Sequence, residues 1–292
     1  MKKIGFIALL ILSFLLLTNC NKEDKKEEIN NVEVKNEKIN FSDESYKLFE
    51  KFANNKKEVM EKLKTLKNKE EVNKLYEKYV TDNNSILDDI NEKTQSFLDS
   101  IHYGPEGTEF TEEDWEDADK ILNKYDLELW DIGEGIVIIR EVPHLYYDVF
   151  KDYVTDDYKE YLRISAKDDE ELYQADAGLC ISFEELGDRI ARWENFLNKF
   201  PNSKLKTKVT VLLNSYREDY ILGMDNTPTR DGGYDSQPYT IIEENMKGFN
   251  RFMKKYPNSP TVELIKYYLE NYENENIYEL VRKKISEKFG NN

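Results

Sequence analysis

The stretch WENFLNKFPNS at residues 193–203 recurs as FNRFMKKYPNS at residues 249–259. Each copy places aromatic residues at the spacing of one helix face, and the proline of the Pro-Asn-Ser turn ends that helix. The similarity continues downstream, where the matching pairs are Val209 and Ile265, Leu213 and Leu269, and Tyr216 and Tyr272. The pattern therefore predicts two copies of a helix, a turn and a second helix, with Asn or Ser available to cap the second helix.

Helices that end in an aromatic residue and Pro-Asn-Ser resemble the tetratricopeptide-like helical hairpins of periplasmic and outer-membrane assembly lipoproteins. The resemblance covers residues 186–288. The two copies lie further apart than the roughly 34-residue tetratricopeptide period. The resemblance therefore implies a mainly α fold of stacked, irregular, tetratricopeptide-like helical hairpins.

The amino terminus has the pattern of an export signal. Two lysines precede an apolar stretch at residues 4–17, which suits a signal peptide and is short of the roughly 20 residues of a membrane-spanning helix. The next residues, Leu17-Thr18-Asn19-Cys20, resemble a lipobox, where bacteria lipidate a cysteine and cleave before it. The resemblance implies a lipoprotein signal peptide at 1–20 and attachment of lipid, such as palmitate, to Cys20. The alternative is an uncleaved amino-terminal anchor.

Hydrophobic periodicity divides the rest of the chain. Residues 21–40 are charged and hold few bulky apolar groups, as expected of a flexible tether. Residues 41–105 have a helical pattern and predict an amino-terminal helical segment. Residues 106–292 predict a helical domain that contains both helix-turn-helix repeats and one small β-hairpin near 127–142, with its turn at Gly133-Glu134-Gly135.

Several local signals make narrower predictions. Thr111 with Asp114, and Ser182 with Glu185, have the spacing of capping boxes at helix starts. Asp82-Asn83-Asn84 predicts a turn. The acidic residues 167–176 predict a loop followed by a helix, and the lone Cys180, in an apolar setting, is expected to be a buried packing residue.

Charge excludes some partners. The 292 residues carry a formal net charge of −17, and aromatic residues make up 13% of them. Nucleic acid repels a chain this acidic. We therefore expect no nucleic-acid partner. The aromatic content indicates a folded body with a core.

Two sets of residues are candidate contact sites. The segment between the repeats contains oxygen-bearing side chains at Asp225, Asn226, Asp231 and Asp235. Calcium prefers such ligands, but the order of residues in an EF-hand is absent, so we assign no metal and expect a loop that contacts a ligand or partner. The second set is Trp193, Phe196, Phe249 and Phe252. Core packing is the favoured interpretation of these aromatics, and the alternative is a groove that accepts a peptide helix or stacks sugar rings.

Signatures of catalysis are sparse. The chain has two histidines, no His-Glu-x-x-His motif and no Gly-x-Ser-x-Gly motif, so we assign no catalytic residue and no cofactor. The sequence favours an envelope lipoprotein, lipid-anchored to a bacterial membrane at the periplasmic face of the outer membrane or the cell surface. It would act as a binding or scaffolding module for a protein or peptide partner. The alternatives are an envelope hydrolase that acts on glycan or peptide through carboxylates, and a purely structural surface lipoprotein.

Overall fold

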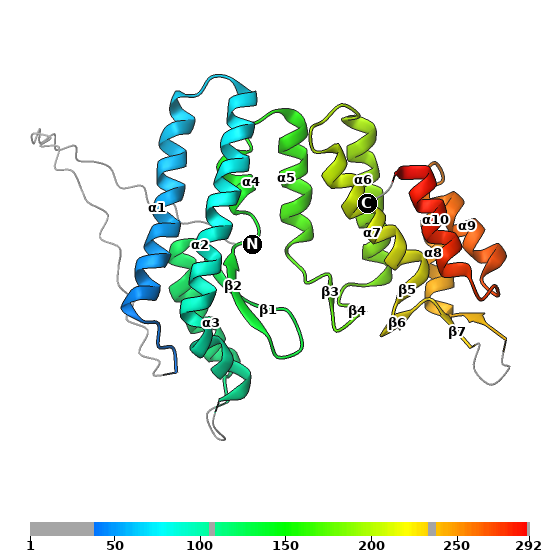
Figure 1. Cartoon of the computed structure of the whole chain (residues 1–292), viewed down its shortest axis with the longest axis horizontal. Helices are drawn as coiled ribbons and strands as arrows, with labels where there is room; N and C mark the ends of the chain where they lie inside the picture. Colours follow the sequence, from blue (N-terminus) through cyan, green and yellow to red (C-terminus); the bar gives the residue numbers. More distant parts are fainter. Residues whose placement is uncertain (1–37, 105–108, 233–237, 291–292) are drawn as a thin grey trace, which may run out of the picture. The chain divides into compact units, whose positions relative to one another are not determined.

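The computed structural model describes residues 38–104, 109–232 and 238–290. Cys20, the predicted signal peptide and most of the predicted tether lie outside these residues. The described chain consists mainly of helices with small two-stranded antiparallel hairpins (Figure 1), which confirms the predicted fold class. Over this part of the chain, no helix is both long and apolar enough to cross a bilayer.

The first two helices form an antiparallel pair, α1 (Asp43–Thr65) and α2 (Lys69–Tyr103) (Figure 1). Asn68 begins α2, where its side chain accepts a hydrogen bond from the Glu70 N–H at 2.9 Å. The turn predicted at residues 82–84 is wrong, because α2 continues through it. Asn83 is fully buried, and its Oδ1 accepts a 2.8 Å hydrogen bond from Asn55 of α1. A tertiary partner thus satisfies the amide that would otherwise favour a turn.

A helix and a hairpin follow. Helix α3 (Glu112–Leu122) starts with the predicted Thr111–Asp114 capping box and leads through η1 (Asn123–Tyr125) into strands β1 (Leu127–Asp131) and β2 (Val137–Glu141). The strands pair antiparallel around the predicted glycine turn, where Gly133, Glu134 and Gly135 all have positive φ. The predicted hairpin is therefore confirmed. Asn91 of α2 bonds both the N–H and the C=O of Ile139 at 2.8 Å, which joins the hairpin to α2.

The next segments connect the hairpin to the repeats. They are α4 (Leu145–Phe150), α5 (Asp156–Asp168), β3 (Gln174–Ala175) and β4 (Gly178–Leu179). The helix predicted within 167–176 is wrong: α5 ends at Asp168 and a hairpin follows, with Asp176 and Ala177 at positive φ. Cys180 follows this hairpin and is exposed, so the expectation of a buried cysteine is also wrong.

The two Pro-Asn-Ser corners have nearly the same geometry. They join α6 (Phe183–Lys199) to α7 (Lys206–Leu222), and α8 (Glu243–Lys255) to α9 (Thr261–Asn271). Phe200 and Tyr256, which end the first helix of each pair, have φ/ψ of −127°/60° and −125°/57°. Ser203 and Ser259 each accept a 3.1 Å hydrogen bond from the N–H two residues later. The sequence repeat is therefore a repeat of structure at the corners, and membership of the tetratricopeptide-like proteins stays a prediction.

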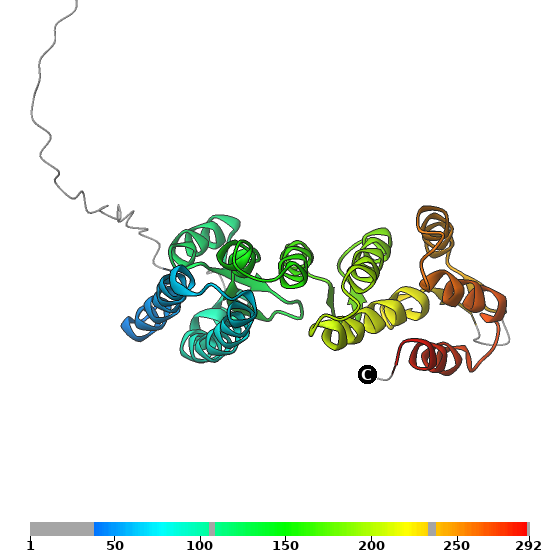
Figure 2. The same cartoon turned by 90° about the horizontal axis from the view of Figure 1, so that it is seen from above.

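The segment between the repeats forms two further short ladders. Strands β5 (Gly223–Met224) and β6 (Thr227–Pro228) pair, as do β7 (Arg230–Asp231) and β8 (Thr240–Ile241). The last described helix, α10 (Ile277–Phe289), packs on α7 and α9 (Figure 2). Gly248 allows α8 to approach α6, because a Cβ there would lie 2.4 Å from the Phe183 ring.

Candidate functional site

The predicted contact loop is only partly assembled. Asp225 and Asp231 line a hollow of about 460 Å³ together with Arg230. Asn226 points elsewhere: its amide donates to the carbonyl of Asp176, so it joins the β5–β6 turn to the β3–β4 turn. Asp235 lies outside the described residues. Over the described residues, no group of three or more His, Cys, Asp or Glu side chains is arranged to hold a metal ion.

The four repeat aromatics, Trp193, Phe196, Phe249 and Phe252, lie in the core, as the favoured interpretation of their spacing predicts. Phe196, Phe249 and Phe252 are fully buried and Trp193 is 1% exposed. Phe249 and Phe252 both pack on Tyr220 of α7, with ring centres 5.4 and 5.5 Å apart. Phe196, Phe249 and Phe252 therefore do not line a surface groove. Of the four aromatics, only Trp193 reaches a pocket.

That pocket, which we call the tyrosine pocket, lies among α2, α4, α5, α6 and α7 and has a volume of about 260 Å³. Its aromatic lining consists of Tyr76, Tyr146, Tyr147, Tyr161, Trp193 and Tyr216. Helix α5 contacts both α4 and α6 (Figure 1), so it brings the amino-terminal helices and the first repeat to the same site.

Helical spacing explains how one helix contributes several side chains to the tyrosine pocket. Tyr161, Ser165 and Asp168 recur at intervals of four and three along α5, and all line the pocket, as side chains on one helix face should. Lys208 and Leu212 share a face of α7 in the same way. The first Pro-Asn-Ser corner fixes this arrangement, because the Ser203 hydroxyl donates to the Asp157 carboxylate of α5 at 2.5 Å.

One carboxylate of the pocket is fully committed to the fold. Asp168 is 5% exposed and accepts hydrogen bonds from Trp193 Nε1 at 2.9 Å and from Arg192 at 2.7 Å. The Arg189 guanidinium lies 3.9 Å away. Asp168 therefore orients Trp193 at the pocket wall and has its charge balanced within the protein.

Two other carboxylates have no such partners. Glu141, at the end of β2, and Asp169, at the exposed rim, line the pocket. Neither carboxylate makes an ion pair or a hydrogen bond with the described residues. Protein nevertheless surrounds the Asp169 carboxyl on most sides, and this burial raises its pKa to about 6, although the nearby Arg140 acts in the opposite direction.

Two tyrosine hydroxyls are also without partners. Tyr76 is 7% exposed and Tyr161 is 8% exposed, yet neither hydroxyl is hydrogen-bonded within the described residues. Burial, then the neighbouring Tyr161, Tyr158 and Asp169, raise the pKa of Tyr76, so its hydroxyl keeps its proton. These two hydroxyls and two carboxylates line the pocket and are not among the polar atoms sealed in the core without a partner. They therefore form a polar lining that the fold does not use.

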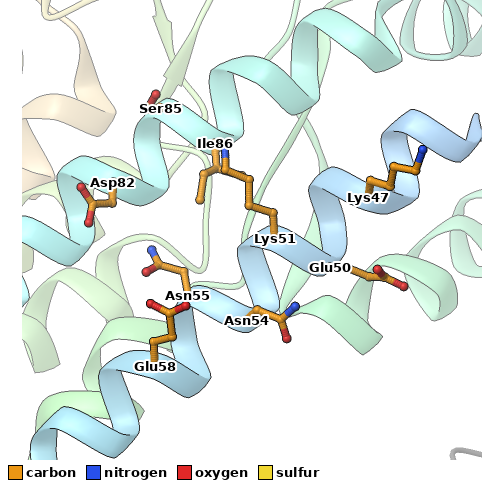
Figure 3. A pocket seen from close by; sticks show the side chains of 9 residues that line it. All are labelled: Lys47, Glu50, Lys51, Asn54, Asn55, Glu58, Asp82, Ser85 and Ile86. Carbon is orange, nitrogen blue, oxygen red and sulfur yellow. The ribbon is translucent and has the colours of Figure 1, made fainter.

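A second hollow lies on the surface between α1 and α2 (Figure 3), with a volume of about 670 Å³. Its lining alternates in charge, with Lys47, Glu50 and Lys51 on α1 facing Asp82 on α2. Lys51 lies 3.6 Å from Asp89, and both side chains are more than half exposed. Mixed, exposed charges of this kind are usual on a helical surface, so the hollow lacks the unpaired buried groups of the tyrosine pocket.

Sequence reasoning missed most of the tyrosine pocket. Its tyrosines lie on helices, and helical periodicity does not distinguish a core position from a position that lines a pocket. The local signal was the acidic pair Asp168-Asp169 one turn after Ser165, on the face that carries Tyr161. No local pattern shows that tyrosines from separate helices converge.

Known proteins offer no match to this arrangement. No family model matches the chain. No curated protein matches it, and no solved structure does.

Proposed function

We propose that this chain is a lipid-anchored protein of the bacterial cell envelope whose helical body binds a small ligand in the tyrosine pocket. The signal-like amino terminus and Cys20 support the anchor. The observation that carries the binding function is the set of unpaired polar groups, Tyr76, Tyr161, Glu141 and Asp169, around one cavity. A ligand with matching groups can form hydrogen bonds or ion pairs with them.

The architecture supports binding rather than a purely structural role. The pocket wall comes from five helices and the end of β2, and sites built on regular elements hold their geometry well. Asp168 fixes Trp193 from behind the wall. Its volume of about 260 Å³ lies just below the usual range for small-molecule sites, which suits a compact ligand or a single side chain of a peptide.

Thermal unfolding of the full chain in detergent tests the binding function. The probes are small ammonium compounds, neutral sugars and inorganic phosphate, applied to the wild type and to Ser165→Trp, which fills the pocket. At about 100 times its dissociation constant, a ligand should raise the Tm by roughly 5–10 °C. The shift should be absent in Ser165→Trp and kept in the control Ser96→Trp, on an exposed position of α2. A wild type that no probe class stabilises would reject the proposal.

Incorporation of radiolabelled palmitate tests the anchor separately. Label on the wild type and none on Cys20→Ala is the expected result. Absence of label on both would remove the lipid anchor from the proposal and leave the pocket argument intact.

A second candidate function is a hydrolase that acts on glycan or peptide. The observation that favours it is the pKa of Asp169, which burial raises to about 6 next to Glu141, since a carboxyl with a raised pKa in a cleft suits a general acid. Turnover of a glycan or peptide substrate that is lost in Asp169→Asn, with the substrate still bound, would establish this function.

A further inference from the structure

We infer that the tyrosine pocket binds an organic cation, an ammonium group small enough to lie among its aromatic rings. The inference rests on the proposed binding function and assigns the ligand class. Two features of the pocket carry it: carboxylates that lack an ion-pair partner among the described residues, and aromatic rings in the same lining.

The charge of the lining is the first argument. Asp168 is balanced by Arg192 and Arg189, whereas Glu141 and Asp169 have no ion-pair partner in the part of the chain that the structure describes. The arginine on the hairpin, Arg140, pairs with Glu128 at 2.7 Å and donates to the backbone carbonyl of Asp169 at 2.9 Å, so it lies near the Asp169 carboxylate without forming an ion pair with it. A neutral ligand that displaced water here would leave two carboxylates desolvated without a counter-ion, which is costly. An anionic ligand would add repulsion.

The aromatic lining is the second argument. A cation gains energy over the face of a tyrosine or tryptophan ring, and the gain grows when the site is desolvated. Two rings of the pocket already attract ammonium groups of the protein. Lys208 Nζ lies 5.1 Å from the centre of the Tyr161 ring, and Lys151 Nζ lies 5.2 Å from that of Tyr147. Both lysines are attached at exposed or partly exposed positions. Lys208 lines the pocket, so a ligand cation would take the place of its ammonium group over the Tyr161 ring.

The hydroxyls fit the same ligand class. A tyrosine hydroxyl accepts a hydrogen bond from an N–H donor while its own proton points to an acceptor. Tyr76 and Tyr161, each more than nine-tenths buried, offer both possibilities in the same pocket as Asp169. A primary ammonium would use these hydroxyls directly, and a quaternary ammonium would use the rings and carboxylates alone.

Isothermal titration calorimetry on the full chain in detergent tests the inference with matched probes. The probes are choline, its uncharged isostere 3,3-dimethyl-1-butanol, butylammonium, and N-acetylglucosamine as a neutral sugar. We expect choline or butylammonium to bind at least about tenfold more tightly than the uncharged isostere. Because the isostere differs in charge alone, this comparison needs no variant.

Paired variants then locate the site. Glu141→Gln with Asp169→Asn should weaken cation binding by at least about tenfold. The control, Asp88→Asn with Glu92→Gln, removes the same charge from exposed positions of α2 and should change binding by less than about twofold. Equal binding of choline and its isostere, or binding of the sugar alone, would overturn the cation inference and keep the binding function. No binding by any of these probes to the wild type would count against both.

Discussion

Two regions rich in polar side chains lie beside the first repeat. They differ in how many of these side chains have hydrogen-bond or ion-pair partners within the protein. The closed region surrounds Arg217 of α7, which is 1% exposed. Its guanidinium donates to Glu194 at 2.9 Å, to Thr261 at 2.9 Å and to Asn214 at 3.0 Å, and lies 3.6 Å from the centre of the Phe289 ring. Residues from α6, α7, α9 and α10 thus close around one charge.

The open region is the tyrosine pocket on the other side of α6. Asp168 has a complete set of partners there, whereas the side chains of Tyr76, Tyr161, Glu141 and Asp169 have no hydrogen-bond or ion-pair partner among the described residues. Polar groups that hold helices together are satisfied by other residues of the chain, because breaking them would cost stability. Polar groups that face a cavity without partners in the protein add no such stability, and the proposed binding function rests on them.

The largest effect should come from breaking the closed region. Glu194→Ala leaves Arg217 buried without its carboxylate and should lower the free energy of unfolding by about 3–5 kcal/mol. Urea unfolding in detergent measures this loss.

The matched control replaces both charges. Glu194→Leu with Arg217→Met leaves no unpaired charge and should lose clearly less stability than Glu194→Ala alone. A single variant that cost less than about 1 kcal/mol would mean that the region is not closed in solution.

The second-largest loss of stability should come from a change at Asp168. This residue lines the pocket, but like Arg217 it has its hydrogen-bond partners within the protein. Asp168→Ala removes the partner of Trp193 Nε1 and of Arg192 and should cost about 2–4 kcal/mol. The control Asp152→Ala, whose side chain is 72% exposed in its pair with Lys159, should cost less than about 0.5 kcal/mol. Equal losses by chemical denaturation would contradict the structural role of Asp168.

The contrast between the two regions also explains what the sequence could predict. The helix starts at Thr111 and Ser182, the hairpin turn at 133–135 and both Pro-Asn-Ser corners depend on local chemistry, and the structure has each of them. Thr111 and Asp114 form both bonds of the capping box. Ser182 caps α6 by accepting from the Glu185 N–H, but the Glu185 carboxylate turns to Arg192.

Two of the failures involve contacts between distant residues. The turn predicted at 82–84 did not form because Asn55, on another helix, bonds Asn83. The pocket was missed because Tyr76, Tyr146 and Tyr216 come from three helices whose relative placement periodicity does not encode. The repeat aromatics show the other side of this limit, because their strong periodicity favoured core packing and all four side chains are buried.

The third effect concerns pH and Asp169. Burial holds the pKa of this carboxyl at about 6 in the folded protein, above its ordinary value of 3.8. A raised folded-state pKa means that stability is fully present below pH 3.8 and is lost as the pH rises to 6. Asp169→Asn cannot ionise, so it should be more stable than the wild type at pH 7, by no more than about 1 kcal/mol after allowance for solvent exposure, and equally stable at pH 3.5.

Asp188 supplies a control of opposite sign. Burial raises its pKa, but hydrogen bonds from Arg251, Lys255 and Tyr256 outweigh burial and lower it to about 2. Asp188→Asn should therefore be less stable than the wild type at pH 7, and the difference should shrink as the pH falls from 3.8 to 2. Unfolding curves across this range separate the two variants. The same sign for both would show that Asp169 has a partner in solution.

The smallest change in the free energy of unfolding is expected for removal of the pocket hydroxyls. It tests directly whether these hydroxyls lack partners within the protein. Tyr76→Phe and Tyr161→Phe remove hydroxyls that bond to nothing in the described chain, so each should change the free energy of unfolding by less than about 0.5 kcal/mol. Tyr158→Phe is the matched control on α5, because the Tyr158 hydroxyl donates to Glu77 and its removal should cost about 1 kcal/mol.

These variants also separate stability from binding. If the pocket hydroxyls serve a ligand, Tyr76→Phe and Tyr161→Phe should leave unfolding unchanged and weaken binding of butylammonium, which donates N–H groups, more than binding of choline, whose nitrogen has none. If each variant instead loses as much stability as Tyr158→Phe, the hydroxyls have partners within the protein. The tyrosine pocket would then be as closed as the region around Arg217.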